Sequence, residues 1–179
     1  EVEKKCPKTV SCADILTAAS RDATVIQGGP YWSIPYGRKD GKVSIDKEAE
    51  SVPTAHRLYD YEGTGKPDSL LDERYANYLT RKCRWGSDYV ELEGMSPGKF
   101  NNQYYKNLQK KMGLLRTDQM LYADSRTSPF VNAMAYAPDS VFHNQFAASM
   151  TKFGNILDPE VQEGGEVRAD CGYVNSYDY

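Results

Sequence analysis

Histidine is scarce in this sequence, with two residues in 179. Chemistry that needs an imidazole therefore rests on His56 or His143. Long apolar runs are missing too: no stretch approaches the roughly 20 residues of a membrane-spanning helix, and the mean hydropathy is −0.68. Basic residues are not in excess, since 22 Lys and Arg stand against 25 Asp and Glu. We therefore expect neither a membrane nor a nucleic-acid partner.

Several catalytic signatures are also absent from the sequence. It contains no glycine-rich phosphate loop, no Gly-x-Ser-x-Gly elbow and no Cys/His spacing typical of zinc sites. These absences argue against the commonest nucleotide-binding, serine-hydrolase and structural-zinc classes. The four cysteines leave a disulfide framework open. A length of 179 residues favours a single domain.

Hydrophobic spacing predicts a mostly α-helical chain. Ser11, with Asp14 three residues later, resembles a capping box and predicts a helix over residues 11–27, stopped by Gly28-Gly29-Pro30. Further helices are predicted at residues 68–83, 101–112, 129–137 and 139–153. The last of these carries an apolar stripe that we expect in the core, formed by Phe142, Phe146, Met150 and Phe153.

The two ends of the sequence are less regular. Residues 1–7 contain no initiator Met, no basic segment and no apolar segment, so they do not match a signal peptide. They resemble the end of a helix that stops at Pro7. Residues 166–179 are rich in Tyr and are predicted to be irregular.

Several motifs of two to five residues follow one another along the chain. They include Cys6-Pro7, Val10-Ser11-Cys12-Ala13-Asp14, Gly28-Gly29-Pro30, Gly37-Arg38-Lys39-Asp40, Arg57-Leu58-Tyr59, Phe100-Asn101-Asn102, Thr117-Asp118-Gln119 and Gly165-Glu166-Val167-Arg168. Together they resemble the plant secretory (class III) haem peroxidases over nearly the whole chain. The resemblance implies an all-α, haem-peroxidase-like fold over residues 1–179, incomplete and mainly of the proximal, C-terminal part.

This resemblance implies an activity and a location. Members of the family oxidise phenolic donors with hydrogen peroxide on haem b, which removes peroxide and serves the response to oxidative stress. Calcium ions and disulfides are their structural aids, and the proteins are secreted to the cell wall or vacuole. Phenolic compounds and hydrogen peroxide are thus the partners that the resemblance implies.

Two parts of the family pattern are missing from the sequence. One is the N-terminal half with the distal arginine and histidine in an Arg-x-x-Phe-His-Asp-Cys pattern. The other is the Gly-x-His-Thr-x-Gly motif of the proximal histidine, because only Thr54-Ala55-His56 separates Val52-Pro53 from Arg57-Leu58-Tyr59. We therefore expect a truncated member with little or no activity and with exposed apolar surface. The alternative is a non-catalytic fragment, acting as an interaction module or without function.

The resemblance also assigns individual residues near the haem. His56 echoes the family's iron ligand, but no Thr-x-x-Gly follows it, so a surface-loop histidine is the preferred interpretation. His143 lies where the family has no haem ligand, and Pro53 resembles the donor-channel proline. Asp118 resembles the buried carboxylate that hydrogen-bonds the proximal histidine. We expect it to have lost that partner, and a carboxylate buried without any donor would be costly.

Calcium and cysteine positions follow from the same comparison. The family's calcium positions fall on Glu93, Ser96 and Asn101, a weak set for an ion that binds about six to eight oxygens. A capped turn without metal is therefore the preferred interpretation. The family's pairing joins Cys12 to Cys171, whereas the partners of two other cysteines lie in the missing segments, leaving Cys6 and Cys83 unpaired. A disulfide implies an oxidising compartment.

Overall fold

The computed structural model describes residues 1–43, 56–83, 88 and 90–175. Within these residues the chain is helical, and its strand-like pairing is limited to one antiparallel bridge between Asp40 and Glu166. The all-α fold predicted from the sequence is confirmed. The chain divides into two compact units, one formed by Glu1–Asp46 with His143–Tyr179 and the other by Lys47–Phe142.

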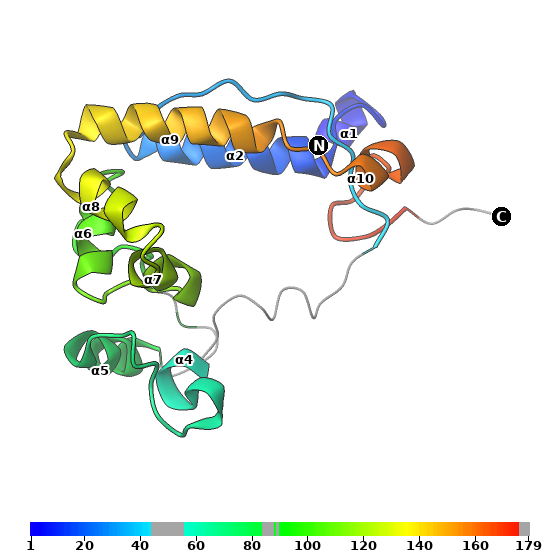
Figure 1. The fold of residues 1–179 in the computed structure, drawn as a ribbon. Coiled ribbons are helices and arrows are strands. Elements are labelled where there is room, and N and C mark those ends of the chain that lie inside the picture. The colour runs from blue at the N-terminus through cyan, green and yellow to red at the C-terminus, as the bar shows by residue number, and fades with distance from the viewer. Residues whose placement is uncertain (44–55, 84–87, 89, 176–179) are drawn as a thin grey trace. The chain divides into compact units, whose positions relative to one another are not determined.

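The first unit contains the two chain ends and the longest helices. It holds α1 (Val2–Lys5), α2 (Cys12–Ile26), most of α9 (Asp139–Gly154) and α10 (Pro159–Gly164) (Figure 1). Helix α2 begins at its capping residue, because the Ser11 hydroxyl accepts the Asp14 N–H at 3.1 Å. It is followed by Gly28 at a φ of +85°, a conformation that glycine adopts without steric cost.

Helix α10 was not predicted, although its sequence carries a local signal. The Asp158 carboxylate accepts the N–H groups of Glu160 at 2.9 Å and Val161 at 3.4 Å. Pro159 occupies the first helical position, where its missing N–H is no loss. The Asp158 cap and the position of Pro159 thus account for this short helix, whose sequence has no apolar periodicity.

The second unit is built from shorter helices around two groups of buried side chains. Its elements are α4 (His56–Tyr59), the 3-10 turn η1 (Tyr61–Gly63), α5 (Glu73–Lys82), α6 (Gln103–Gln109), α7 (Arg116–Ala123) and α8 (Ser128–Tyr136). Helices α6, α7 and α8 pack against one another. Leu108, Val131 and Ala135 are fully buried on α6 and α8, while Leu71 and Leu79 belong to a cluster around α5.

Two helices of this unit are shorter than predicted. The helix expected at 68–83 begins at Glu73, because Asp72 caps it by accepting the Tyr75 N–H at 3.0 Å. Asp68 lies in the preceding turn, where its carboxylate accepts the Leu70 N–H at 2.8 Å. The helix expected at 101–112 spans only Gln103–Gln109, since Lys111 has a φ of +58°, outside the right-handed helical region.

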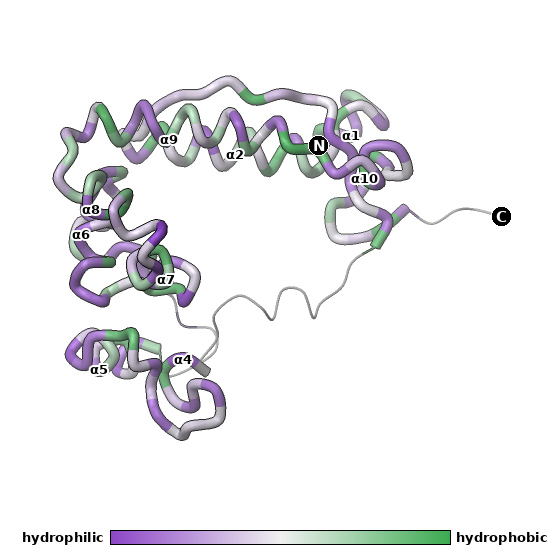
Figure 2. Tube along the Cα trace, in the orientation of Figure 1, coloured by the Kyte–Doolittle hydropathy of each residue, from purple (hydrophilic) through white to green (hydrophobic). Residues whose placement is uncertain are grey.

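The apolar stripe of α9 is a core feature at one end only. Hydrophobic positions recur along this helix between hydrophilic ones (Figure 2). Phe142 is buried, with its ring 5.0 Å from that of Phe100, and Phe146 contacts Trp32 edge to face at 5.7 Å. Phe153, however, is 68% exposed, so the expectation of a core position is wrong there.

The exposed Phe153 side chain is part of a wider apolar surface on the first unit. With Leu16 of α2, Met150 and Ile156 it lines an open cavity of about 300 Å³. Leu16 and Ile156 are themselves exposed. Arg38 donates to the Gly154 carbonyl at the end of α9, but the Phe153 side chain stays exposed beside this contact. None of the helices in the described part has the length and apolar character to span a bilayer.

Candidate functional site

Arg57, from the Arg-Leu-Tyr motif, is the buried centre of the second unit. Its Nε atom donates to Asp68 Oδ2 at 2.8 Å, and both side chains are almost completely buried. Its Nη1 atom donates to the carbonyl oxygens of Gly113 at 2.7 Å and Leu114 at 2.6 Å. One side chain thereby joins α4, the turn before α5 and the α6–α7 loop, while Nη2 has no hydrogen-bond partner among the described residues.

Asp118, at the start of α7, is bound by two protein donors. Its Oδ1 atom accepts the hydroxyl proton of Tyr104 from α6 at 2.8 Å, and its Oδ2 atom accepts the Leu115 N–H at 3.2 Å. The carboxylate therefore has donors other than a histidine, and the cost of a carboxylate without a donor does not arise. Burial raises the pKa of the Tyr104 hydroxyl, and the negative charge and hydrogen bond of Asp118 raise it further. The hydroxyl is thus a stable donor near neutral pH.

The loop that carries Asp118 is fixed by its neighbour Gln119. The Gln119 side chain is buried, donates to the Leu108 carbonyl at 2.9 Å and accepts the Gly113 N–H at 3.0 Å. A Cβ atom at Gly113 would lie 2.8 Å from the Leu108 side chain. The sequence motifs include Gln119 but give no role to Gln119 or Tyr104, because their roles depend on the packing of α6 on α7.

Among the described residues, the donors to Asp118 do not include a histidine. The Oδ1 and Oδ2 atoms of Asp118 each accept one hydrogen bond, from Tyr104 and Leu115, and each oxygen keeps one further acceptor position. His56 is the first residue of α4, but its side chain is outside the described part of the chain, as is Pro53. His143 lies on α9 in the first unit and is half-buried.

The positions that the resemblance assigns to calcium form a hydrogen-bonded loop. The Glu93 carboxylate accepts the backbone N–H groups of Met95 at 2.5 Å and Ser96 at 2.7 Å, and the Ser96 hydroxyl at 2.6 Å. It also accepts the Asn107 side-chain amide at 2.7 Å. Asn101 Oδ1 accepts the Gln103 N–H at 2.9 Å. These oxygens are directed at protein donors.

Charge in this loop is concentrated on Glu93. Burial alone would raise the pKa of its carboxyl, but the hydrogen bonds from Ser96, Met95 and Asn107 outweigh that effect and lower the pKa. Across the described residues no group of three or more Asp, Glu, His or Cys side chains is placed to hold a metal ion. The loop therefore does not fit a calcium ion, which needs several free oxygens.

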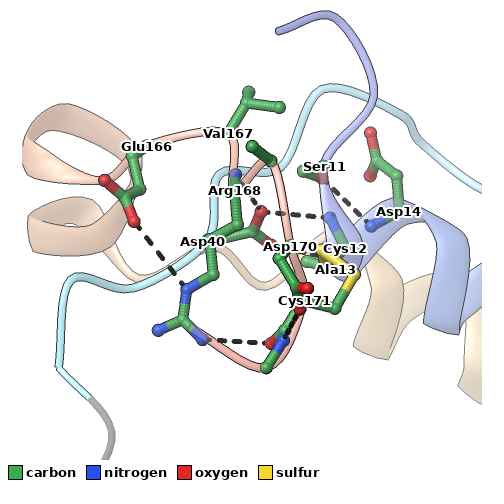
Figure 3. The surroundings of a disulfide bond; sticks show 12 residues. Ser11, Cys12, Ala13, Asp14, Asp40, Glu166, Val167, Arg168, Asp170 and Cys171 are labelled. Atoms are coloured by element: carbon green, nitrogen blue, oxygen red, sulfur yellow. Dashed lines mark hydrogen bonds and ion pairs between the residues drawn. A yellow bond between two sulfur atoms is a disulfide. The ribbon is translucent and has the colours of Figure 1, made fainter. Parts of the chain in front are cut away.

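In the first unit, motif residues surround a disulfide between Cys12 and Cys171, whose Cα atoms are 5.6 Å apart. Figure 3 shows the Asp40 carboxylate beside it, at the start of α2. This carboxylate accepts the backbone N–H groups of Cys12 at 3.0 Å, Ala13 at 2.8 Å and Arg168 at 3.0 Å. An anion at a helix N-terminus is favourable, so Asp40 both caps α2 and holds the C-terminal segment.

Two cysteines remain as free thiols. Cys6 is exposed, and Cys83 is half-buried at the end of α5. Burial and the charge of Asp88 raise the pKa of the Cys83 thiol. Since the thiolate is the reactive form, this thiol is a poor nucleophile.

Comparison with known proteins identifies the family. A family model described as peroxidase matches residues 1–57 and 49–137. Peroxidase 7 of Arabidopsis thaliana is 42% identical over 220 residues, covering 100% of this chain and 63% of the relative. The chain belongs to the plant class III peroxidase family. Peroxidase 49 of Arabidopsis thaliana is 34% identical over 98% of the chain, and Peroxidase C2 of Armoracia rusticana is 33% identical over the same share.

The coverage of these class III peroxidases is partial. The chain spans 66% of the length of Peroxidase 49 and 63% of Peroxidase C2. The two segments matched by the family model meet and overlap at residues 49–57. Membership of the peroxidase family therefore identifies the ancestry of this chain, whereas its own chemistry has to be argued from its residues.

Proposed function

We propose that this chain supplies the helical scaffold of a class III peroxidase without forming a competent haem-iron centre of its own. The family activity is oxidation of phenolic donors by hydrogen peroxide on haem b. That activity needs a histidine on the iron and a carboxylate that orients the histidine. The observation that carries the proposal is the hydrogen bond between Tyr104 and Asp118, since the described side chain bound to this carboxylate is a tyrosine and not a histidine.

An internal gap supports the proposal. The alignment with Peroxidase 7 runs over 220 positions, although this chain has 179 residues, so the relative contains residues without a counterpart here. The family model also matches in two pieces that meet at residues 49–57. Both observations favour the loss of the segment with the Gly-x-His-Thr-x-Gly motif between Pro53 and Arg57.

The motif residues that remain have structural roles in this chain. Arg57 joins three segments of the second unit, Gln119 fixes the α6–α7 loop, and Asp40 holds the C-terminal segment on α2. A sequence that keeps these contacts can keep its helices in place without the catalytic residues. The Cys12–Cys171 disulfide supports an oxidising, secretory location.

A specific observation favours a second candidate function, a peroxidase that uses His56 as iron ligand. Arg57, the next residue, donates to the carbonyl oxygens of Gly113 and Leu114. The following residue, Leu115, donates its N–H to Asp118. The Arg57 side chain therefore ties the start of α4 to the loop that carries the orienting carboxylate, which is the neighbourhood that a proximal histidine needs.

Turnover distinguishes the two candidates. The purified chain is mixed with haem, and peroxide-dependent oxidation of a phenolic dye is compared with the same concentration of free haem. The scaffold proposal predicts rates equal to those of free haem, with no change in His56→Ala. Rates well above free haem that are lost in His56→Ala and kept in His143→Ala would support the enzyme instead.

A further inference from the structure

The loop around Glu93 is tied to helix α6 by a single carboxylate. Glu93 receives hydrogen bonds from Met95 and Ser96 in its own loop and from Asn107 on α6. Asn107 is itself buried, and its Oδ1 atom accepts the Gln103 side-chain amide at 2.9 Å. The carboxylate therefore connects the loop to the buried side of the helix that also carries Tyr104.

Four donors saturate this carboxylate. An ionised carboxyl group has two oxygens with about four acceptor positions, and four donors lie between 2.5 and 2.7 Å from the two oxygens. A hard cation binds the same electron pairs and cannot share them with N–H groups that point inward. Binding would require the loop to break these bonds and turn its carbonyl oxygens toward the ion.

We propose that Glu93 replaces a calcium ion as the organiser of this loop, so that the second unit folds without calcium. The inference stands apart from the proposed function, since it concerns the metal and not the haem. In the family the resemblance assigns these positions to a cation held by oxygens. In this chain the charge is inverted: an anion lies at the centre, and three N–H groups and the Ser96 hydroxyl donate to it. Charge-assisted hydrogen bonds of this kind are among the strongest in proteins.

The test is thermal unfolding of the full chain, followed by circular dichroism in calcium chloride and in EGTA. We expect the same Tm in both solutions. Glu93→Gln should lower the Tm by roughly 5–10 °C in both, because an amide has one acceptor oxygen and turns an NH₂ group toward the donors. Glu91→Gln is the matched control. Glu91 lies two residues before Glu93 and its side chain is exposed, so this variant removes the same charge and should leave the Tm unchanged.

Calcium titration of the unaltered chain provides a second readout that does not depend on the variant folding. The proposal predicts no calorimetric binding signal and no change in Tm. A Tm that rises with calcium and falls with EGTA would overturn it, as would saturable calcium binding. Equal Tm values for Glu93→Gln and Glu91→Gln would overturn the organising role of Glu93.

Discussion

The Tyr104 hydroxyl donates to the Asp118 carboxylate at 2.8 Å, across the contact between α6 and α7. This one bond satisfies two polar groups that burial would otherwise penalise. It also gives the half-buried Asp118 carboxylate a donor in place of the histidine that the family resemblance implies.

Removal of the Tyr104 hydroxyl should destabilise the second unit. In Tyr104→Phe the Oδ1 atom of Asp118 loses its donor, and we expect a loss of about 1–3 kcal/mol of unfolding free energy. In a double-mutant cycle, Asp118→Asn should cost less in the Tyr104→Phe background than alone. Urea unfolding measures both. Tyr122→Phe, which removes a hydroxyl from α7, is the control, and strictly additive losses would contradict the coupling.

Alkaline pH should destabilise the same unit through Tyr75. Burial, and then the neighbouring Tyr78, raise the pKa of Tyr75 to about 12. An unfolded tyrosine ionises near pH ~10, so the unfolded state loses its proton first as the pH rises. This contribution to stability is complete below pH ~10 and is lost between about 10 and 12.

Urea midpoints measured across an alkaline series test this pH dependence. Tyr75→Phe should reduce the slope of stability against pH, whereas Tyr173→Phe, at an exposed position, should not. The raised pKa of Tyr104 has the same effect on stability, so part of the slope of stability against pH remains in Tyr75→Phe. A midpoint that is constant over this pH range would contradict the burial of these tyrosines.

Reduction should destabilise the first unit. The Cys12–Cys171 bridge closes a loop with a sequence separation of 159 residues, and a bridge over a long loop contributes about 3–5 kcal/mol. Thermal unfolding with and without reductant should show a lower Tm in the reduced chain. Cys6→Ser with Cys83→Ser is the control and should keep that difference. A reductant effect that vanishes in this control would point to the free thiols instead.

Exposed apolar side chains should make the chain prone to association. Leu16 and Phe153 line an open cavity and are 66% and 68% exposed, and apolar patches of this kind bind hydrophobic dyes. Leu16→Gln with Phe153→Gln should lower dye fluorescence and light scattering with little change in Tm. Unchanged scattering in this variant would show that association has another cause.

Local sequence signals predicted the start of a helix correctly where a few neighbouring residues determine it. Ser11 and Asp14 set the start of α2 through one side chain and one N–H group, and the resemblance implied the Cys12–Cys171 pair. Helix α7 was missed because Leu115, the residue before it, has no capping side chain. The Asp118 carboxylate three residues later performs that role from inside the helix.

The candidate site is formed by contacts between residues far apart in the sequence, and hydrophobic periodicity does not predict such contacts. Tyr104 and Asp118 are 14 residues apart and meet because Gln119 and Gly113 set the path of the loop between them. The sequence indicated that Asp118 had lost its histidine, but not that a tyrosine had replaced it. Arg57 was recognised as part of a motif, and its three-way contact required the packed second unit.

The central claim, that this peroxidase chain has no competent haem-iron site, is tested most directly by the visible spectrum of the purified chain during haem titration. We expect a Soret band like that of free haem, the same in the unaltered chain, His56→Ala and His143→Ala. A shifted, saturable Soret band that disappears in His56→Ala and remains in His143→Ala would contradict it and identify His56 as the iron ligand.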